Sequence, residues 1–155
     1  MALEIERKFL VTDDGYKNSA KKTLYRQGYL SLTPERTVRV RICDDKAYLT
    51  IKGNLNGITR PEFEYSIPVS DAEVLLSMCE KPIIEKYRYT LTYDGVTWIV
   101  DEFSGDNEGL VIAEVELDDE NQPFSKPGWA GEEVSGDPRY YSSNLVRYPY
   151  KSWNR

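Results

Sequence analysis

The sequence predicts a mainly β fold of the α+β class: a closed, tunnel-like barrel of eight antiparallel strands, with helices packed outside. Eight segments alternate polar or charged side chains with apolar ones, as a strand with two different faces does. Short turns such as Asp44-Asp45 and Asp94-Gly95 separate neighbouring segments, which favours antiparallel hairpins. Eight strands suit a closed barrel, and residues 1–155 should form a single domain.

The predicted strands follow the alternation along the chain. In the third strand, Arg39 and Arg41 take one face while Val38 and Val40 take the other. Pro61 removes a donor from the fifth strand, so we expect a bulge or a strand end there. The eight segments are Leu3–Val11, Tyr25–Leu32, Thr37–Cys43, Lys46–Gly53, Ile58–Ile67, Ile84–Tyr93, Val96–Phe103 and Leu110–Asp118.

Three helices are predicted between and after these strands. Asp13 or Asp14 could cap a short helix before Lys22. Ser70 and Glu73 have the spacing of a capping box for a second helix, which stops before Pro82. A third helix should start with Asp137 as N-cap and Pro138 at its first position, and should run to about Tyr148. The segment 121–136 has no regular pattern.

Composition excludes several classes of function. The chain has 40% hydrophobic and 30% charged residues and a net charge of −6, which favours a globular protein that binds neither nucleic acid nor membrane. No secretory signal is visible, so we predict a cytoplasmic protein in which Cys43 and Cys79 are free thiols. Histidine is absent, which rules out His-dependent triads and zinc sites.

The charged faces segregate by sign. Acidic residues occupy the first, fifth and eighth predicted strands, and basic residues occupy the third, fourth and sixth. Two layouts are compatible with this pattern. Either the apolar faces form the core and the charges are solvated, or the charges line a wet lumen and helices cover an apolar outer wall.

A cluster of basic residues in a lumen would be costly without an anion. Two like charges 4 Å apart repel by about 4 kcal/mol at an effective dielectric near 20. Arginine pairs bind phosphate oxygens, and carboxylates bind Mg²⁺ or Mn²⁺, so the set suits phosphoanhydride chemistry. No Walker A sequence is present. The basic residues concerned are Lys8, Arg39, Arg41, Lys52, Lys86 and Arg88.

The chain opens with Glu4-x-Glu6-x-Lys8, two acids and a lysine on one face of a strand, and six further motifs follow it. In this order the motifs resemble those of the CYTH superfamily, the triphosphate tunnel metalloenzymes. The first motif, Glu4-x-Glu6-x-Lys8, is similar to the family's ExExK signature, and the short chain resembles the small bacterial members. The motifs that follow it in the family's order are Arg39-x-Arg41, Lys52, Arg60-x-Glu62-x-Glu64, Lys86-x-Arg88, Asp101-x-Phe103 and Glu114-x-Glu116.

The resemblance implies a tunnel that binds a linear triphosphate and a divalent metal, Mg²⁺ or Mn²⁺. By it, the six basic residues named above bind the phosphates, and Lys8, Tyr29 and Lys86 are the catalytic candidates. The roles of Tyr29 and Asp101 are less closely fixed by the motifs. The metal-side candidates are Glu4, Glu6, Glu114 and Glu116, followed by Glu62, Glu64 and Asp101.

The resulting prediction is a metal-dependent hydrolase that cleaves inorganic triphosphate to pyrophosphate and phosphate. No aromatic or glycine-rich base pocket stands out beside the tunnel, which favours the inorganic substrate. The alternatives are a thiamine or nucleoside triphosphatase, a class IV-type adenylate cyclase, and a non-catalytic polyphosphate-binding module. Leftover apolar wall could support a homodimer.

Overall fold

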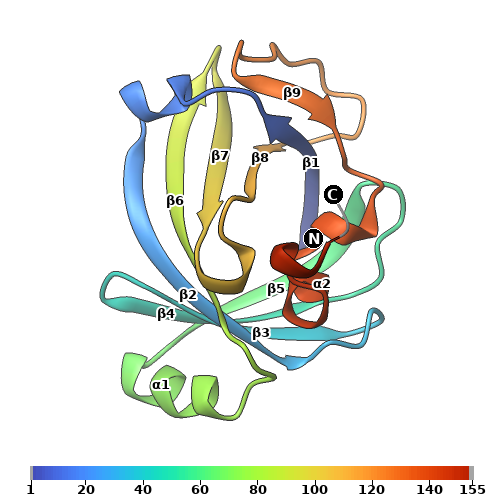
Figure 1. Cartoon of the computed structure of the whole chain (residues 1–155). Coiled ribbons are helices and arrows are strands. Elements are labelled where there is room, and N and C mark those ends of the chain that lie inside the picture. Colours follow the sequence, from blue (N-terminus) through green and yellow to red (C-terminus); the bar gives the residue numbers. More distant parts are fainter. Residues whose placement is uncertain (1, 154–155) are drawn as a thin grey trace.

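The computed structural model describes residues 2–153, which form one sheet closed into a barrel (Figure 1). The strand order is β5-β4-β3-β2-β6-β7-β8-β1, and a β5–β1 pairing closes the ring, which confirms the predicted eight-stranded barrel. Every neighbouring pair is antiparallel. These strands are β1 (Leu3–Val11), β2 (Lys21–Ser31), β3 (Thr37–Cys43), β4 (Lys46–Lys52), β5 (Thr59–Ile67), β6 (Ile84–Tyr93), β7 (Val96–Phe103) and β8 (Val111–Glu116).

Strand β1 is the seam of the barrel. Its first half pairs with β5, from Leu3 opposite Pro61 to Ile5 opposite Thr59. Its second half leaves β5 and pairs on the same edge with a ninth strand, β9 (Ala130–Glu133). Pro61 remains inside β5, and its carbonyl accepts a hydrogen bond from the Gly53 backbone, so the strand does not end there.

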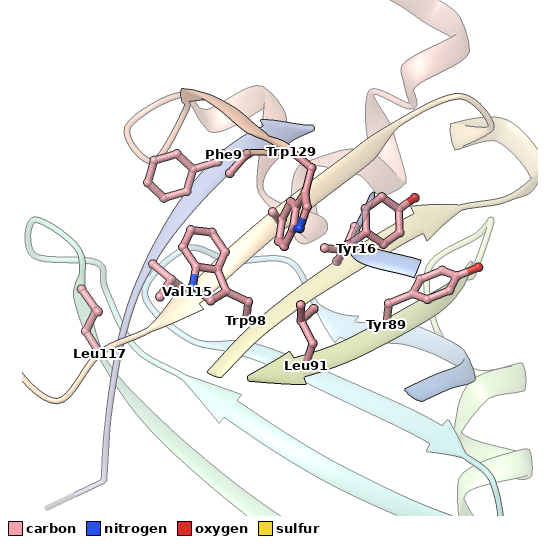
Figure 2. Close-up of a cluster of buried hydrophobic side chains, with 11 residues drawn as sticks. Phe9, Tyr16, Tyr89, Leu91, Trp98, Val115, Leu117 and Trp129 are labelled. Atoms are coloured by element: carbon pink, nitrogen blue, oxygen red, sulfur yellow. The ribbon is translucent and has the colours of Figure 1, made fainter. Parts of the chain in front are cut away.

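The apolar faces of the strands point outward, as the wet-lumen layout requires. The side chains of Phe9, Trp98 and Trp129 pack together on the outer wall (Figure 2). The ring centroids of Phe9 and Trp98 are 5.5 Å apart, and those of Trp98 and Trp129 are 5.6 Å apart. The barrel is therefore stabilised mainly from outside, by the chain segments that fold back over its wall.

Helix α1 (Val69–Ser77) covers another part of the outer wall, where it contacts β2, β3 and β4 (Figure 1). Ala72 and Leu76 of the helix are buried against Val40 of β3. A glycine is required opposite the end of the helix, because a Cβ atom on Gly28 would lie 2.8 Å from the Cβ atom of Cys79.

One end of the barrel interior is apolar and is covered by the C-terminal segment. Leu145 and Val146 of α2 (Ser142–Arg147) are buried with Phe103, Ile112 and Tyr29. Three short 3-10 helices complete this region: η2 (Gly105–Asn107), η3 (Pro138–Tyr140) and η4 (Tyr150–Ser152). The rest of the interior remains polar, so the charged cavity has a closed apolar end.

Two helix predictions were wrong in their details. The predicted helix before Lys22 is only a 3-10 turn, η1 (Gly15–Asn18), because β2 starts at Lys21 to pair with β6. The capping box at Ser70 does not form. Helix α1 begins two residues earlier than predicted, with Pro68 as N-cap, and the Glu73 carboxylate lies 2.8 Å from Arg26 instead.

The C-terminal part differs from the prediction in two places. The segment 121–136, expected to be irregular, contributes β9 because β1 offers it a free edge. Asp137 does cap the turn that follows, since its side chain accepts a hydrogen bond from the Arg139 backbone. The last helix is not continuous, because Tyr141 adopts an extended conformation between η3 and α2.

Some of the outer wall is not covered. Leu3, Ile51, Phe63 and Tyr65 are exposed large apolar residues of β1, β4 and β5. The homodimer stays a prediction.

Within residues 2–153, the structure contains no helix that is long and apolar enough to cross a membrane.

Candidate active site

The inward faces of the strands surround a charged cavity of about 380 Å³. Because side chains alternate along a strand, Arg39 and Arg41 of β3 both point into it, as do Lys86 and Arg88 of β6. The six predicted phosphate-binding residues and Tyr29 all line it, as do Glu4, Glu6, Glu62, Glu64, Glu114 and Glu116. The structure thus brings together every predicted site residue except Asp101 around one space.

Asp101 is buried on the inward face of β7 without lining the cavity, and it holds two of the basic residues that do. Its carboxylate accepts hydrogen bonds from Lys86 Nζ at 2.7 Å and from Arg88 Nε and Nη2 at 2.9 Å each. Burial would raise the pKa of Asp101, but the charges of Arg88 and Lys86 outweigh it and lower the pKa to about 2. Its role as a metal ligand stays a prediction, and in this arrangement its oxygens are occupied by the two cations.

Lys86 is the most deeply buried of the basic groups, at 1% exposure. Burial, reinforced by the charges of Arg88 and Arg41, lowers the pKa of Lys86 to about 7, although Asp101 acts in the opposite direction. An ammonium group that titrates near neutral pH can hold or release a proton under ordinary conditions.

Arg39 and Arg41 are held by neutral side chains. Arg41 Nε donates to Gln27 Oε1 at 2.9 Å, and Arg39 Nη2 donates to Thr50 Oγ1 at 3.3 Å. Arg39 also lies 3.6 Å from a Glu64 oxygen. In the described part of the chain no carboxylate lies within ion-pair distance of Arg41. This guanidinium is therefore available to bind an anion in the cavity.

Lys8 is surrounded by acids. Its ammonium lies 3.3 Å from Glu6 and 3.4 Å from Glu114, on the paired strands β1 and β8. Burial disfavours the charged amine, but Glu114, Glu6 and Glu4 together raise the pKa of Lys8. Lys8 therefore remains a fixed positive charge at neutral pH.

The carboxylates lie in two pairs, Glu6 with Glu114 and Glu4 with Glu62, and each pair contacts one lysine. Burial and the charge of Glu114 raise the pKa of Glu6 well above its usual range. Glu114 is buried too, but Lys8 and a hydrogen bond from Glu6 lower its pKa. Lys52 links the second pair, 2.8 Å from Glu4 and 3.3 Å from Glu62.

A divalent cation suits this set of donors. Carboxylate oxygens are the ligands that Mg²⁺ and Mn²⁺ prefer. Burial and the charge of Glu114 raise the pKa of Glu116, and a cation beside these two acids would relieve their repulsion. Within residues 2–153, no three carboxylates stand close enough together to form a ready metal cluster. The acids therefore fit a metal by chemistry, while their present partners are lysines and one another.

Sequence reasoning missed several cavity residues. Tyr25 lies on the same face of β2 as Tyr29, four residues away, so the alternation could have identified it. The C-terminal segment also reaches the cavity, through Ser135 and residues 141–143. No local pattern placed these hydroxyl-bearing residues there, because the chain has to fold back across the barrel to bring them in.

The structure defines a class of protein: an eight-stranded barrel around a charged cavity, with basic residues mainly on β3, β4 and β6 and acidic residues on β1, β5 and β8. The model of the CYTH domain family matches residues 2–144, so the chain belongs to the CYTH domain family. Triphosphatases of this family are in general metal-dependent.

Particular relatives have known names. The chain is 58% identical to the inorganic triphosphatase of Acetivibrio thermocellus, over 99% of both chains. It is 37% identical to the inorganic triphosphatase of Nitrosomonas europaea, over 92% of this chain and 96% of the relative. Among solved structures, that of the inorganic triphosphatase NE1496 superposes with a TM-score of 0.67 at 36% identity, covering 94% of this chain and 95% of the other.

Proposed function

We propose that this protein is a metal-dependent hydrolase that converts inorganic triphosphate to pyrophosphate and phosphate. The observation that carries the proposal is the cavity itself, in which the six predicted cationic side chains and Arg60 face a set of carboxylates. The relatives named as inorganic triphosphatases support the same substrate, since one of them shares 58% of its residues with this chain.

The basic residues would bind the phosphates. The guanidinium groups of Arg39, Arg41 and Arg88 can each donate two parallel hydrogen bonds to phosphate oxygens. Lys8 and Lys52 add fixed positive charge between the carboxylates and the substrate. Phosphoryl transfer depends mainly on positioning and charge neutralisation, which this arrangement supplies.

Three residues would act closest to the chemistry. Lys86 has a pKa of about 7, so it can donate a proton or a hydrogen bond to the leaving pyrophosphate. Lys8 keeps its proton and would stabilise charge that develops on the terminal phosphate. Tyr29 lines the cavity with little exposure, 5%, and its hydroxyl would orient the phosphate chain.

Glu4, Glu6, Glu114 and Glu116 would hold the metal, with Glu62 and Glu64 beside them. Bound Mg²⁺ or Mn²⁺ supplies Lewis acidity and lowers the pKa of a coordinated water. The acids of this chain would orient that water relative to the terminal phosphate. Glu6, the acid with the most strongly raised pKa, would lose its proton when the divalent charge is present.

The test is phosphate release from inorganic triphosphate, thiamine triphosphate and ATP, each assayed with Mg²⁺ and with Mn²⁺. We expect inorganic triphosphate to be cleaved with the highest kcat/KM, and a chelator to abolish turnover. Faster cleavage of thiamine triphosphate or ATP would make this an organic triphosphatase. Cyclic AMP and pyrophosphate from ATP would identify a cyclase instead.

A binding module is the alternative from a different class. It would bind triphosphate tightly and release no phosphate with either metal. The carboxylates argue against it, because pure anion binding gains nothing from Glu6 and Glu114 next to Lys8. Calorimetric binding measured beside the phosphate assay separates the two cases.

A further inference from the structure

Tyr25 lies between two of the arginines that face the cavity. The Cζ atom of Arg41 is 4.8 Å from the centroid of the Tyr25 ring, and the Cζ atom of Arg88 is 4.7 Å from it. Tyr25 is on β2, and the two arginines come from its neighbours on either side, β3 and β6. One aromatic ring therefore contacts guanidinium groups from both flanking strands.

The two arginines need something to hold them together. Both are positively charged, and burial, followed by the charges of Arg39 and Arg88, lowers the pKa of Arg41 to about 9. Arg88 is compensated by the carboxylate of Asp101, whereas the side-chain hydrogen bond of Arg41 goes to the neutral Gln27. The negative face of an aromatic ring attracts a guanidinium without removing its hydrogen-bond donors.

We propose that Tyr25 is a positioning residue, whose ring holds Arg41 and Arg88 side by side so that both can bind the phosphates of one substrate. This rests on the proposed function only in naming triphosphate as the anion. A carboxylate in the same place would also neutralise the arginines, but it would compete with the phosphates for their N–H groups. A ring takes up none of the N–H groups that Asp101 and Gln27 leave available.

The ring, and not the hydroxyl group, carries this role. Within residues 2–153 the Tyr25 hydroxyl forms no hydrogen bond with another residue, although the side chain lines the cavity. Phenylalanine should therefore substitute for tyrosine, and an aliphatic side chain of similar size should not.

The same ring is poorly placed to recognise an organic group on the substrate. A nucleobase or thiazole ring would have to stack on a face of Tyr25 to gain affinity. Arg41 and Arg88 already lie over this ring, so a stacking group would compete with them for contact with it. Tyr25 thus favours an inorganic phosphate chain.

The experiment compares Tyr25→Phe, Tyr25→Leu and Tyr25→Trp in two assays: steady-state hydrolysis of inorganic triphosphate, and calorimetric binding of triphosphate to metal-free protein. We expect Tyr25→Leu to raise KM and the binding Kd by about tenfold, with a smaller change in kcat, since two cation–π contacts are lost. Tyr25→Phe should stay within about twofold of the wild type, and Tyr25→Trp should restore most of the affinity.

Tyr87→Leu is the matched control. Tyr87 lies on the outer wall of β6, where its ring centroid is 4.3 Å from Lys22 Nζ. The leucine variant therefore loses a cation–π contact that is remote from the cavity. This variant should bind and hydrolyse triphosphate as the wild type does. If Tyr25→Leu does not fold, Tyr25→Met provides the second aliphatic comparison.

Two results would overturn the proposal. Wild-type affinity for triphosphate in a folded aliphatic variant would show that the aromatic ring is not required to position the two arginines for binding. An equal loss in Tyr25→Phe would assign the role to the hydroxyl group. Failure of the proposed function is distinguishable, because it would abolish hydrolysis in the wild type and leave the binding comparison intact.

Discussion

Lys86 and Asp101 form an ion pair of 2.7 Å in which both side chains are almost fully removed from solvent, at 1% and 2% exposure. They lie on paired strands, where Asp101 stands opposite Arg88 and reaches diagonally to Lys86. One carboxylate thus compensates two cations, Lys86 and Arg88, that face the cavity.

Asp101→Asn should destabilise the fold strongly. It leaves Lys86 and Arg88 buried with no neutralising partner, and removal of one member of a buried pair costs about 3 kcal/mol. Urea unfolding followed by fluorescence measures the change. The matched control is Asp106→Asn, which breaks an exposed pair with Lys151 and should cost less than about 1 kcal/mol. Equal losses in both variants would contradict the structural role of Asp101.

The same carboxylate should make stability depend on pH in a defined window. The pKa of Asp101 is about 2 in the fold, below its ordinary value of 3.8, so the unfolded chain binds the proton more readily. Ionised Asp101 contributes about 2 kcal/mol to the free energy of unfolding. This contribution is fully present above about pH 4 and is lost as the pH falls from about 4 to about 2.

The difference between wild type and Asp101→Asn isolates this contribution, because the other carboxylates titrate in both proteins. We expect the gap in unfolding free energy, measured by urea titration at pH 5 and at pH 2.5, to narrow in acid. A gap that stays constant would mean that Asp101 is not held ionised by its neighbours.

The strand pattern predicted the inward charged faces because side chains alternate with a period of two and the signs segregate by strand. Arg39 and Arg41 on β3, and Lys86 and Arg88 on β6, therefore lie in one cavity as expected. The choice between a solvated and an enclosed charged face could not come from alternation alone. It depends on the segments that cover the outer wall, such as the one carrying Trp129.

Features that depend on distant contacts were not predictable from local patterns. Glu73 has the spacing of a capping residue, yet it pairs with Arg26 of a neighbouring strand. The strand β9 forms because β1 leaves β5 halfway along its length. The contacts of Tyr25 with Arg41 and Arg88 depend on the pairing of β2 with β3 and β6, which no local pattern around Tyr25 indicates.

Glu6→Gln should abolish hydrolysis while leaving the fold intact. An amide keeps the shape and hydrogen-bonding capacity of the protonated acid beside Glu114, but it cannot supply a negative oxygen to a divalent cation. We expect kcat to fall by about 100-fold or more, with a melting temperature close to that of the wild type. Phosphate release and calorimetry measure the two quantities.

Glu132→Gln is the control for this change, since Glu132 is an exposed residue of β9 outside the cavity. It should hydrolyse triphosphate at the wild-type rate. Undiminished turnover in Glu6→Gln would count against a role for Glu6 at the metal side of the site.

The two cysteines should differ in reactivity toward thiol reagents, and the reaction rate of one of them should change when substrate binds. Cys43 is half-buried and lines the cavity, whereas Cys79 is buried under α1, where burial raises the pKa of its thiol. A thiol reagent such as iodoacetamide should therefore modify Cys43 first. Mass spectrometry of the modified protein identifies the labelled position.

Inorganic triphosphate should slow this modification, because phosphates held by Arg41 would lie close to Cys43, two residues along the same inward face of β3. Cys43→Ser should remove the fast phase completely and leave a slow reaction of Cys79 that appears only on unfolding. Labelling of Cys43 at the same rate with and without saturating triphosphate would place the bound anion elsewhere in the barrel.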